Sequence, residues 1–563
     1  MAVSSYQPPK VKRFRVWPMK AVRDALAPQA RKPDEVFRLE NCYAQDTEVG
    51  PLIVGRPGFW LLGPTGTSGA PSTSNLGTND GTRRTQLIHQ FTKRDGTEIS
   101  IVIVEGRIYT LNWSTQIWSE PVSTANLTTA SITLSDSALC YAVTFGDTVV
   151  ISDGVNTPWS WDGTAGAGGL TSLTNAPVFY GPMVVHYAKL MGIKASARGT
   201  FVWSEEGLAN TGYEAGGYNN AWDFVQTSAE GLTCLAATND ALYVFRANSH
   251  TAVIGAITTD FRTTGTREAL DPTIGTISPA AVIVIGNAVW FVDQYGIFRR
   301  TQVGNGCQEI GHGAREYMKT ISGTDFPSIQ AVDDVETGHV RFAVKQPGGF
   351  DELDTMLWLN REDGRYASRE YGYALSRLGL LKDAAGLPTV IHGGGGNSTN
   401  AADGWIFAHG HLDQSYWNDG YRNWAQYLPT WSYAATSNAI VHVIETPPMG
   451  YDTALDKMWV RGELSTTMPT NLSAVSLYFT TPNGLSDALT LSNLTGSGTP
   501  LGTFVLGVDT LASEAEERKA TFQMRQRGRW CRMKLTHSTK SERFAISELA
   551  LEAVAVSRRP GVN

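Results

Sequence analysis

The sequence has few of the features that mark redox, metal-binding or membrane proteins. Its 563 residues include five cysteines, which are scattered and odd in number, and no Cys-x-x-Cys or Cys/His cluster occurs. Neither a disulfide framework nor a zinc site is therefore expected. No apolar run approaches roughly 18 residues, and the basic N-terminal segment lacks the apolar stretch of a signal peptide. We expect a soluble chain, without a membrane-spanning segment, made in a reducing cytoplasm.

Catalytic signatures are also lacking. No GxSxG, HExxH, GxxxxGK[ST] or EF-hand pattern occurs. His392-Gly-Gly-Gly-Gly396 is similar to the oxyanion loop of lipases, but no nucleophile elbow accompanies it, so we interpret it as a flexible loop. His409 and His411 have no third ligand nearby, so we interpret them as surface histidines. We predict that the chain is not an enzyme and has no catalytic residues, cofactor or metal site.

What the sequence does have is a strand-rich composition. It contains 57 Gly, 25 Pro, 16 Trp, 20 Tyr and 20 Phe with 18% charged residues, a balance that favours an all-β protein. Residues 280–300 show the basic unit. It is an apolar strand ending at Ile285, a Gly286-Asn287 turn, a strand Ala288–Val292, a turn at Asp293–Gly296 and a third strand to Arg300. The apolar runs are too short for typical helices, so we predict a small antiparallel sheet.

The same pattern recurs along the chain. Counted from Gly106, Gly146, Ala188, Asn239 and Gly286, each of which precedes an apolar strand, the intervals are 40, 42, 51 and 47 residues. A four-stranded propeller blade occupies roughly 40–50 residues. We therefore predict an all-β fold with very little helix, in which residues 51–425 form a β-propeller with loop insertions. The alternative is an unrelated series of antiparallel hairpins.

Both chain ends differ from the propeller region. Residues 1–50 are interpreted as an N-terminal arm, and residues 426–563 as a C-terminal β-sandwich, because candidate strands recur there at sandwich-like spacing. A phase change in the apolar alternation across Gly528 predicts a β-bulge. One helix is expected over residues 313–321.

Charge is distributed unevenly around the net value of −7. Residues 1–32 carry eight Lys or Arg and one acid, Arg518–Lys534 carries seven basic residues and no acid, and the remainder has a balance of −21. Basic ends on an acidic body indicate electrostatic docking between subunits or onto another partner. A disordered tail, phosphate binding by the arm and a simply salt-bridged sheet face are the alternatives. The candidate subunit or adaptor contacts are Lys10, Lys12, Arg13, Arg15, Trp17, Arg525, Arg527, Arg529 and Arg532.

The order of short motifs resembles that of the tail-hub or nozzle proteins of short-tailed bacteriophages, the packaged-DNA stabilisation proteins. The resemblance is clearest over residues 177–372, and its evidence is the order of the motifs rather than any one of them. The matching elements are Arg56-Pro57-Gly58, Phe201–Ser204, Asn220–Phe224, Glu230-Gly231, Leu242–Arg246, Ile274-Gly275, Val282–Arg300, Ala314–Ile321, Ile329–Val344 and Gly528–Arg532.

This resemblance implies a structural virion protein that combines a propeller with a platform built from both chain ends, residues 1–50 and 426–563. It would form a homohexameric ring of the viral tail, assembled in the host cytoplasm, below the adaptor and portal of the head-tail connector and above tail fibre or needle proteins. The ring would close the channel, retain packaged dsDNA without sequence-specific binding and allow DNA ejection. The family implies no catalytic residues.

Two other functions remain open. A carbohydrate-binding or sialidase-like propeller is one, since Ser152–Trp159 distantly resembles the turn-stabilising Asp box of such propellers. A receptor-binding tail protein is the other, with Tyr213, Tyr218 and Trp222 as candidate loop contacts.

Overall fold

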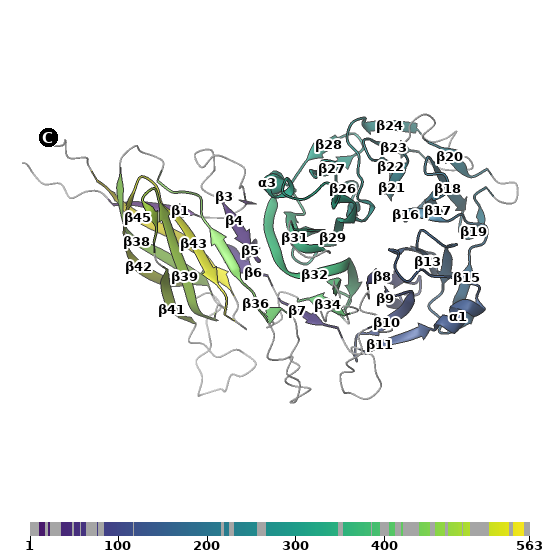
Figure 1. The fold of residues 1–563 in the computed structure, drawn as a ribbon, viewed down its shortest axis with the longest axis horizontal. Coiled ribbons are helices and arrows are strands. Elements are labelled where there is room, and N and C mark those ends of the chain that lie inside the picture. The colour runs from purple at the N-terminus through teal and green to yellow at the C-terminus, as the bar shows by residue number, and fades with distance from the viewer. Residues whose placement is uncertain are drawn as a thin grey trace, which may run out of the picture.

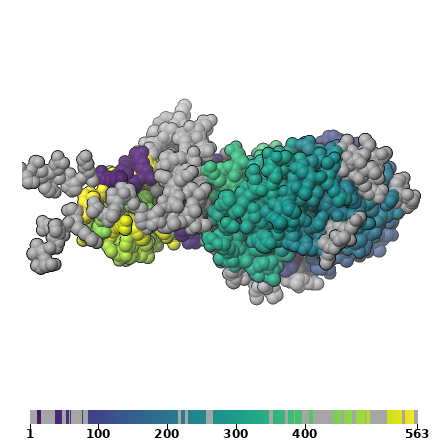
Figure 2. Space-filling model, turned by 90° about the horizontal axis from the view of Figure 1, so that it is seen from above, coloured from purple at the N-terminus to yellow at the C-terminus, as the bar shows by residue number. Residues whose placement is uncertain are grey.

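The computed structural model shows an all-β chain with two lobes, a β-propeller and a platform built from both chain ends (Figures 1 and 2). This confirms the predicted fold class. The residues that the structure describes are 11–16, 21–22, 35–47, 50–56, 58–62, 76, 84–115, 117–214, 219–224, 230–255, 266–346, 353–383, 385–394, 405–410, 418–419, 438–450, 456–467, 471–486, 488–495, 517–539 and 544–556.

Five blades of the propeller are separate antiparallel sheets of consecutive strands. Blade 1 is β8 (Thr85–Thr92), β9 (Glu98–Val104), β10 (Arg107–Asn112) and β11 (Ile117–Val122), and blade 2 is β12 (Tyr141–Phe145), β13 (Thr148–Ser152), β14 (Trp159–Trp161) and β15 (Leu170–Ser172). Blade 3 is β16 (Phe179–His186), β17 (Lys189–Lys194), β18 (Thr200–Glu205), β19 (Leu208–Gly212) and β20 (Ala221–Asp223). Blade 4 is β21 (Leu232–Ala237), β22 (Ala241–Arg246), β23 (His250–Ile254) and β24 (Thr266–Asp271), and blade 5 is β25 (Ile283–Ile285), β26 (Ala288–Val292), β27 (Phe298–Gln302) and β28 (Gly306–Glu309).

Two further blades share one long strand. Blade 6 is β29 (Gln330–Asp334), β30 (His339–Val344), β31 (Leu353–Asn360) and the first half of β32 (Tyr366–Lys382). The second half of β32 is the inner strand of blade 7, where it pairs with β33 (Pro388–Gly394) and contacts β8 of blade 1. β33 is followed outward by β34 (Ile406–His409) and then by β7 (Phe59–Leu61). A strand that precedes blade 1 in the chain thus completes blade 7, and the described residues form a closed ring of seven blades.

The platform is a sandwich of two sheets with an additional small sheet. One sheet has the order β1 (Val11–Val16), β45 (Glu548–Ala555), β38 (Lys457–Thr467) and β42 (Glu517–Gly528). The facing sheet has the order β4 (Arg38–Glu40), β37 (His442–Glu445), β43 (Arg532–His537) and β39 (Asn471–Thr481), which also pairs with β40 (Gly484–Leu485) and β41 (Leu489–Thr495). The small sheet is β44 (Ala545–Ile546), β6 (Gly50–Gly55) and β5 (Cys42–Thr47), and two-stranded pairs join β2 (Ala21–Val22) to β3 (Glu35–Val36) and β35 (Asn418–Asp419) to β36 (Asn438–Ala439).

The predicted bulge at Gly528 is wrong for a physical reason. β42 ends at Gly528 in one sheet of the sandwich, and β43 begins at Arg532 in the facing sheet. Phe522 and Leu535 both point into the same core although their positions have opposite parity. The alternation therefore changes phase because the chain crosses from one sheet to the other.

Helix is confined to short segments in the described residues. The predicted helix over residues 313–321 is shorter than expected: a 3-10 turn η4 (His312–Ala314) leads into α3 (Arg315–Met318). The others are α1 (Thr124–Thr129), η2 (Ala167–Gly169), η3 (Pro279–Ala281) and η5 (Phe326–Ser328). No helix among the described residues is long and apolar enough to cross a membrane.

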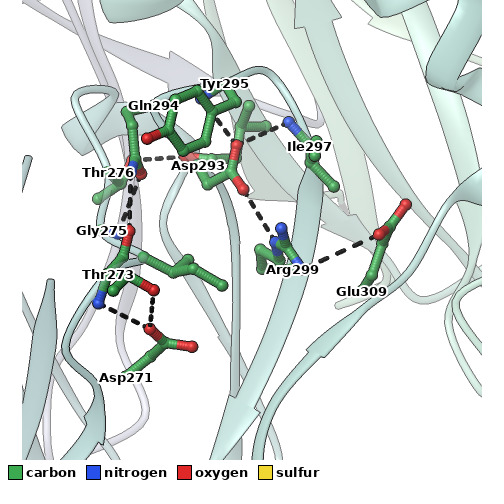
Figure 3. A network of polar contacts seen from close by, with 12 residues as sticks. Asp271, Thr273, Gly275, Thr276, Asp293, Gln294, Tyr295, Ile297, Arg299 and Glu309 are labelled. Carbon is green, nitrogen blue, oxygen red and sulfur yellow. Dashed lines mark hydrogen bonds and ion pairs between the residues drawn. The ribbon is translucent and has the colours of Figure 1, made fainter. Parts of the chain in front are cut away.

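The tight turns between neighbouring strands of a blade follow from the local sequence. The hairpin predicted from residues 280–300 is confirmed, with Gly286 at φ +59° between β25 and β26. In the next turn, the buried Asp293 carboxylate accepts hydrogen bonds from the backbone N–H groups of Tyr295 and Ile297 at 2.8 and 2.9 Å and pairs with Arg299 (Figure 3). Gly296 sits at φ +76°, a conformation that only glycine adopts without strain.

The five positions from which the repeat was counted are not equivalent. Gly106 precedes the third strand of its blade, whereas the other four positions precede the second strand of theirs. The first predicted interval therefore begins one strand too late.

Candidate interaction surfaces

The outer face of the sheet formed by β1, β45, β38 and β42 carries a ladder of charges. Arg13 Nη2 lies 3.2 Å from both Glu463 Oε2 and Glu548 Oε1, and Arg15 Nε lies 2.8 Å from Glu548 Oε1. At the other edge of the sheet, Lys519 Nζ lies 3.7 Å from Glu463 Oε1. The acidic side chains of the two central strands therefore neutralise basic side chains from both ends of the chain.

The ladder engages two of the candidate contact residues within their own chain. Arg13 and Arg15, predicted as subunit or adaptor contacts, lie in β1, which pairs with β45 from Val11↔Val554 to Val16↔Leu549. Lys12 Nζ lies 5.5 Å from the centre of the Phe14 ring. Lys10 and Trp17 lie outside the described residues.

Some of the C-terminal arginines form ion pairs with acidic residues of the same chain, and others do not. Arg532 Nη1 lies 3.0 Å from Glu445 Oε1 with its guanidinium over Phe37, and Arg527 Nη2 lies 3.4 Å from Asp456 Oδ2. Arg525 and Arg529 are exposed, and neither is in an ion pair within the described part of the chain. Of the predicted contacts on this edge, these two remain available for a partner.

A buried ionic network joins the platform to blades 6 and 7. Arg56 Nε lies 3.2 Å from Glu370 Oε1, and both side chains are 1% exposed. The other carboxylate oxygen of Glu370 accepts a hydrogen bond of 3.0 Å from Trp358 Nε1 and lies 3.6 Å from Arg341 Nη1. Arg341 pairs in turn with Asp334. Removing one member would leave an uncompensated buried charge at this junction.

Two histidines extend this network and correct a prediction. His409, which we expected at the surface, is 3% exposed, and its Nδ1 accepts from Arg341 at 3.0 Å. Its Nε2 then carries the proton and donates to His392 Nδ1 at 3.0 Å, so both rings are neutral. Burial lowers the pKa of each well below its ordinary value, and the nearby guanidinium groups of Arg341 and Arg56 act in the same direction. His392 is thus part of β33 rather than of a flexible loop, and His411 lies outside the described residues.

The aromatic residues predicted as loop contacts are not exposed. Tyr213 is 1% exposed and packs on Phe179, and Trp222 is 8% exposed in β20 and packs on Phe201 and Phe224. Both belong to blade cores, and Tyr218 lies outside the described residues. The described aromatic residues therefore do not support the receptor-binding alternative.

A cluster of arginines on the rim of blades 3 and 4 is not indicated by the sequence. The guanidinium carbon of Arg267 lies 4.2 Å from the centre of a ring of Trp222 and 4.6 Å from that of Phe224, and Arg246 also lies over Phe224. Arg198 lies over Tyr180 at 3.9 Å. The three residues come from separate segments, so no local spacing pattern indicates that they converge.

A cavity of about 220 Å³ lies where the inner strands of blades 1, 2, 6 and 7 begin. Lys345 Nζ and Asp325 Oδ1 form an ion pair of 3.5 Å in its lining. Arg84, Gln86, Ser328 and Ser376 also border it. No group of three or more His, Cys, Asp or Glu that could hold a metal ion occurs among the residues described.

Comparison with known proteins gives no family. No family model and no curated protein matches the sequence. Among solved structures, the chain is similar to YCF48 from Cyanidioschyzon merolae (12% identity, 61% of this chain and 99% of that chain, TM-score 0.36). It is also similar to the N-terminal domain of Nup159 (12%, 66% and 98%, TM-score 0.34) and to PorZ of Porphyromonas gingivalis (9%, 59% and 39%, TM-score 0.36). Likeness at this level carries no argument about function.

Proposed function

We propose that the chain is a non-enzymatic structural protein of a viral tail, a nozzle or hub ring that closes the head-to-tail channel, retains packaged DNA and allows its ejection. The observation that carries the proposal is the insertion of a propeller into a platform built from both chain ends. The motif resemblance to tail-hub proteins implies the same combination. The ring would be a homohexamer, located in the virion between the adaptor and portal on one side and fibre or needle proteins on the other.

The two lobes support this role through rigidity. The blades form a closed ring, and the platform is tied to blade 6 by the pairing of Glu40 with Arg369 in β4 and β32. A closed ring of blades gives a rigid block and leaves its edges and loops to contact neighbours. The acidic body outside the two basic segments would repel DNA and keep it from adhering to a channel wall.

Two of the candidate contact residues suit a charge-reversal test. Because Arg13, Arg15 and Arg532 are held in ion pairs of their own chain, charge reversal there would disturb the platform itself. Arg525 and Arg529 are the better test. We expect Arg525→Glu/Arg529→Glu to weaken ring assembly by at least about tenfold, which corresponds to about 1.4 kcal/mol. A matched control is Arg94→Glu on blade 1, where the side chain is also exposed.

Assembly can be measured by native mass spectrometry and negative-stain electron microscopy, alone and with the adaptor of the same virus. The proposal predicts closed rings with six times the mass of 61.1 kDa. A chain that stays monomeric under both conditions and is absent from virus particles would contradict it.

The carbohydrate-binding or sialidase-like alternative would use the cavity at the start of the inner strands. A glycan array followed by the variant Lys345→Ala tests it. Specific glycan binding that this variant abolishes would favour the alternative over a nozzle.

A further inference from the structure

Three arginines converge on one part of the propeller rim, on the side far from the platform. Arg198 lies in the turn between β17 and β18, Arg246 ends β22, and Arg267 lies in β24 (Figure 1). Leu232 connects the first two: its N–H donates to Arg198 O at 2.7 Å, its carbonyl accepts from Arg198 Nη2 at 3.4 Å, and it is the ladder partner of Arg246. Phe224 connects the second and third, since both guanidinium groups lie over its ring.

Packing holds these side chains in place. Trp222 and Phe224 are 8% and 5% exposed, and their ring centres lie 5.4 Å apart, so they give Arg267 a fixed surface. Gly231 leaves room for Arg198, because a Cβ there would lie 2.6 Å from Arg198 Cβ. A guanidinium that packs one face on a ring keeps its in-plane N–H donors for other partners.

The cluster brings three positively charged side chains together. Within the described residues, none of the three arginines is in an ion pair with an acid. Burial, and then the charge of Arg246, lower the pKa of Arg267. Arg–aromatic stacking between the blades explains why Arg267 packs where it does, and the neighbouring charge of Arg246 acts against it.

We propose that this arginine cluster, Arg198, Arg246 and Arg267, binds carboxylate side chains of an acidic polypeptide segment of a partner protein. Carboxylates match the bidentate geometry of guanidinium groups and would relieve the repulsion within the cluster. This site on the propeller would be separate from the assembly contacts proposed for the platform.

The surroundings favour a peptide over nucleic acid. The chain outside its two basic segments has a balance of −21. A nucleic acid strand brings a phosphate at every nucleotide and would be repelled by the negative charge of this body. The aromatic rings are also buried under the guanidinium groups, so bases cannot stack on them. A short peptide segment with spaced acidic residues can place its carboxylates at the arginines without bringing negative charge to the rest of the surface.

The test uses the full chain and a fluorescein-labelled peptide of glutamates separated by Gly-Ser spacers, followed by fluorescence anisotropy at low salt. A peptide with glutamine in place of glutamate is the ligand control. We expect saturable binding of the glutamate peptide that weakens as salt rises, and no binding of the glutamine peptide.

Variants locate the site. Arg246→Gln/Arg267→Gln should weaken peptide binding by at least about tenfold. Arg300→Gln should leave it unchanged; Arg300 also lies over a tryptophan, Trp290, but stands apart from the cluster. If near-UV circular dichroism shows that the double variant is misfolded, Arg198→Gln, on an exposed turn, replaces it and should also weaken binding.

The following results would overturn the proposal. No saturable binding to the wild-type chain, or equal binding by the cluster variants, would show that the arginines serve only to join blades 3 and 4. Displacement of the peptide by a single-stranded oligonucleotide or by inorganic phosphate at lower concentration would assign the site to phosphate instead.

Discussion

Arg13 and Glu548 are 535 positions apart in the sequence, yet their guanidinium and carboxylate groups lie 3.2 Å from each other. The contact accompanies a full ladder of backbone pairs between β1 and β45. The two ends of the chain therefore close the platform as neighbouring strands, while the residues between them form the propeller.

The packing of β1 predicts the effect of Phe14→Ala. Phe14 is the inward residue of this edge strand, with its ring centre 5.3 Å from that of Trp459. Removing the ring should lower the free energy of unfolding of the platform by about 1–3 kcal/mol, measured in urea by tryptophan fluorescence. The control Val11→Ala, at a position 57% exposed, should change it by less than about 0.5 kcal/mol. Equal effects would mean that β1 is not docked.

The buried network predicts a larger effect for Arg56→Leu. This change would leave Glu370 buried without one of its two arginine partners, so we expect a loss of about 3–5 kcal/mol in the free energy of unfolding. Arg15→Leu, which removes an arginine with a 59% exposed side chain from Glu548, should cost less than about 1 kcal/mol. Urea titrations of both variants compare them. A loss below about 1 kcal/mol for Arg56→Leu would contradict the role of the network.

Closure of blade 7 predicts a localised effect of Phe59→Ala. Phe59 in β7 packs on Phe407 at 5.4 Å and on His392 at 5.0 Å between ring centres. Its truncation should cost about 3–5 kcal/mol and should speed amide hydrogen exchange in β34 and β7 more than in blade 3. Uniform exchange along the propeller would show that β7 does not close the ring.

Buried histidines predict that stability falls in mild acid. Burial lowers the pKa of His339 and of His186 to about 4, and the pKa values of His392, His409 and His442 lie well below the ordinary value. The unfolded chain therefore binds more protons, and the stability present above about pH 6.5 is lost as pH falls towards 4.

The contribution of a single histidine to this pH-dependent loss of stability can be measured. Each histidine contributes up to about 1.4 kcal/mol per pH unit in this window. Urea midpoints at several pH values should show a shallower slope for His339→Gln than for His312→Gln, because His312 is 62% exposed on its side chain and pairs with Glu309. A flat profile between pH 6.5 and 5 would contradict the prediction.

How well a feature can be predicted from the sequence depends on how far apart its interacting residues lie along the chain. The hairpin at residues 280–300 is predicted almost residue by residue, because its turn at Gly286 and its alternation are local. Pairing of β7 with β34 joins segments hundreds of residues apart, and no local pattern specifies it. The same holds for β32, whose 17 residues read as one strand although they serve two blades.

Side-chain burial was the less predictable quantity. His409 and Trp222 are polar or amphipathic residues near glycine-rich segments, a context that indicates a surface. Their burial depends on Arg341 and Arg267, which come from other strands. Alternation shows which side of its own sheet a residue faces, but not which sheet the strand joins, as the crossing at Gly528 illustrates.

Locating the protein in virus particles tests the proposed function most directly. Immunogold electron microscopy of intact particles, with an antibody raised against the purified chain, would show where it resides. The proposal predicts label at a single vertex, on the tail axis. Label confined to peripheral fibres, or particles without label, would contradict a tail nozzle.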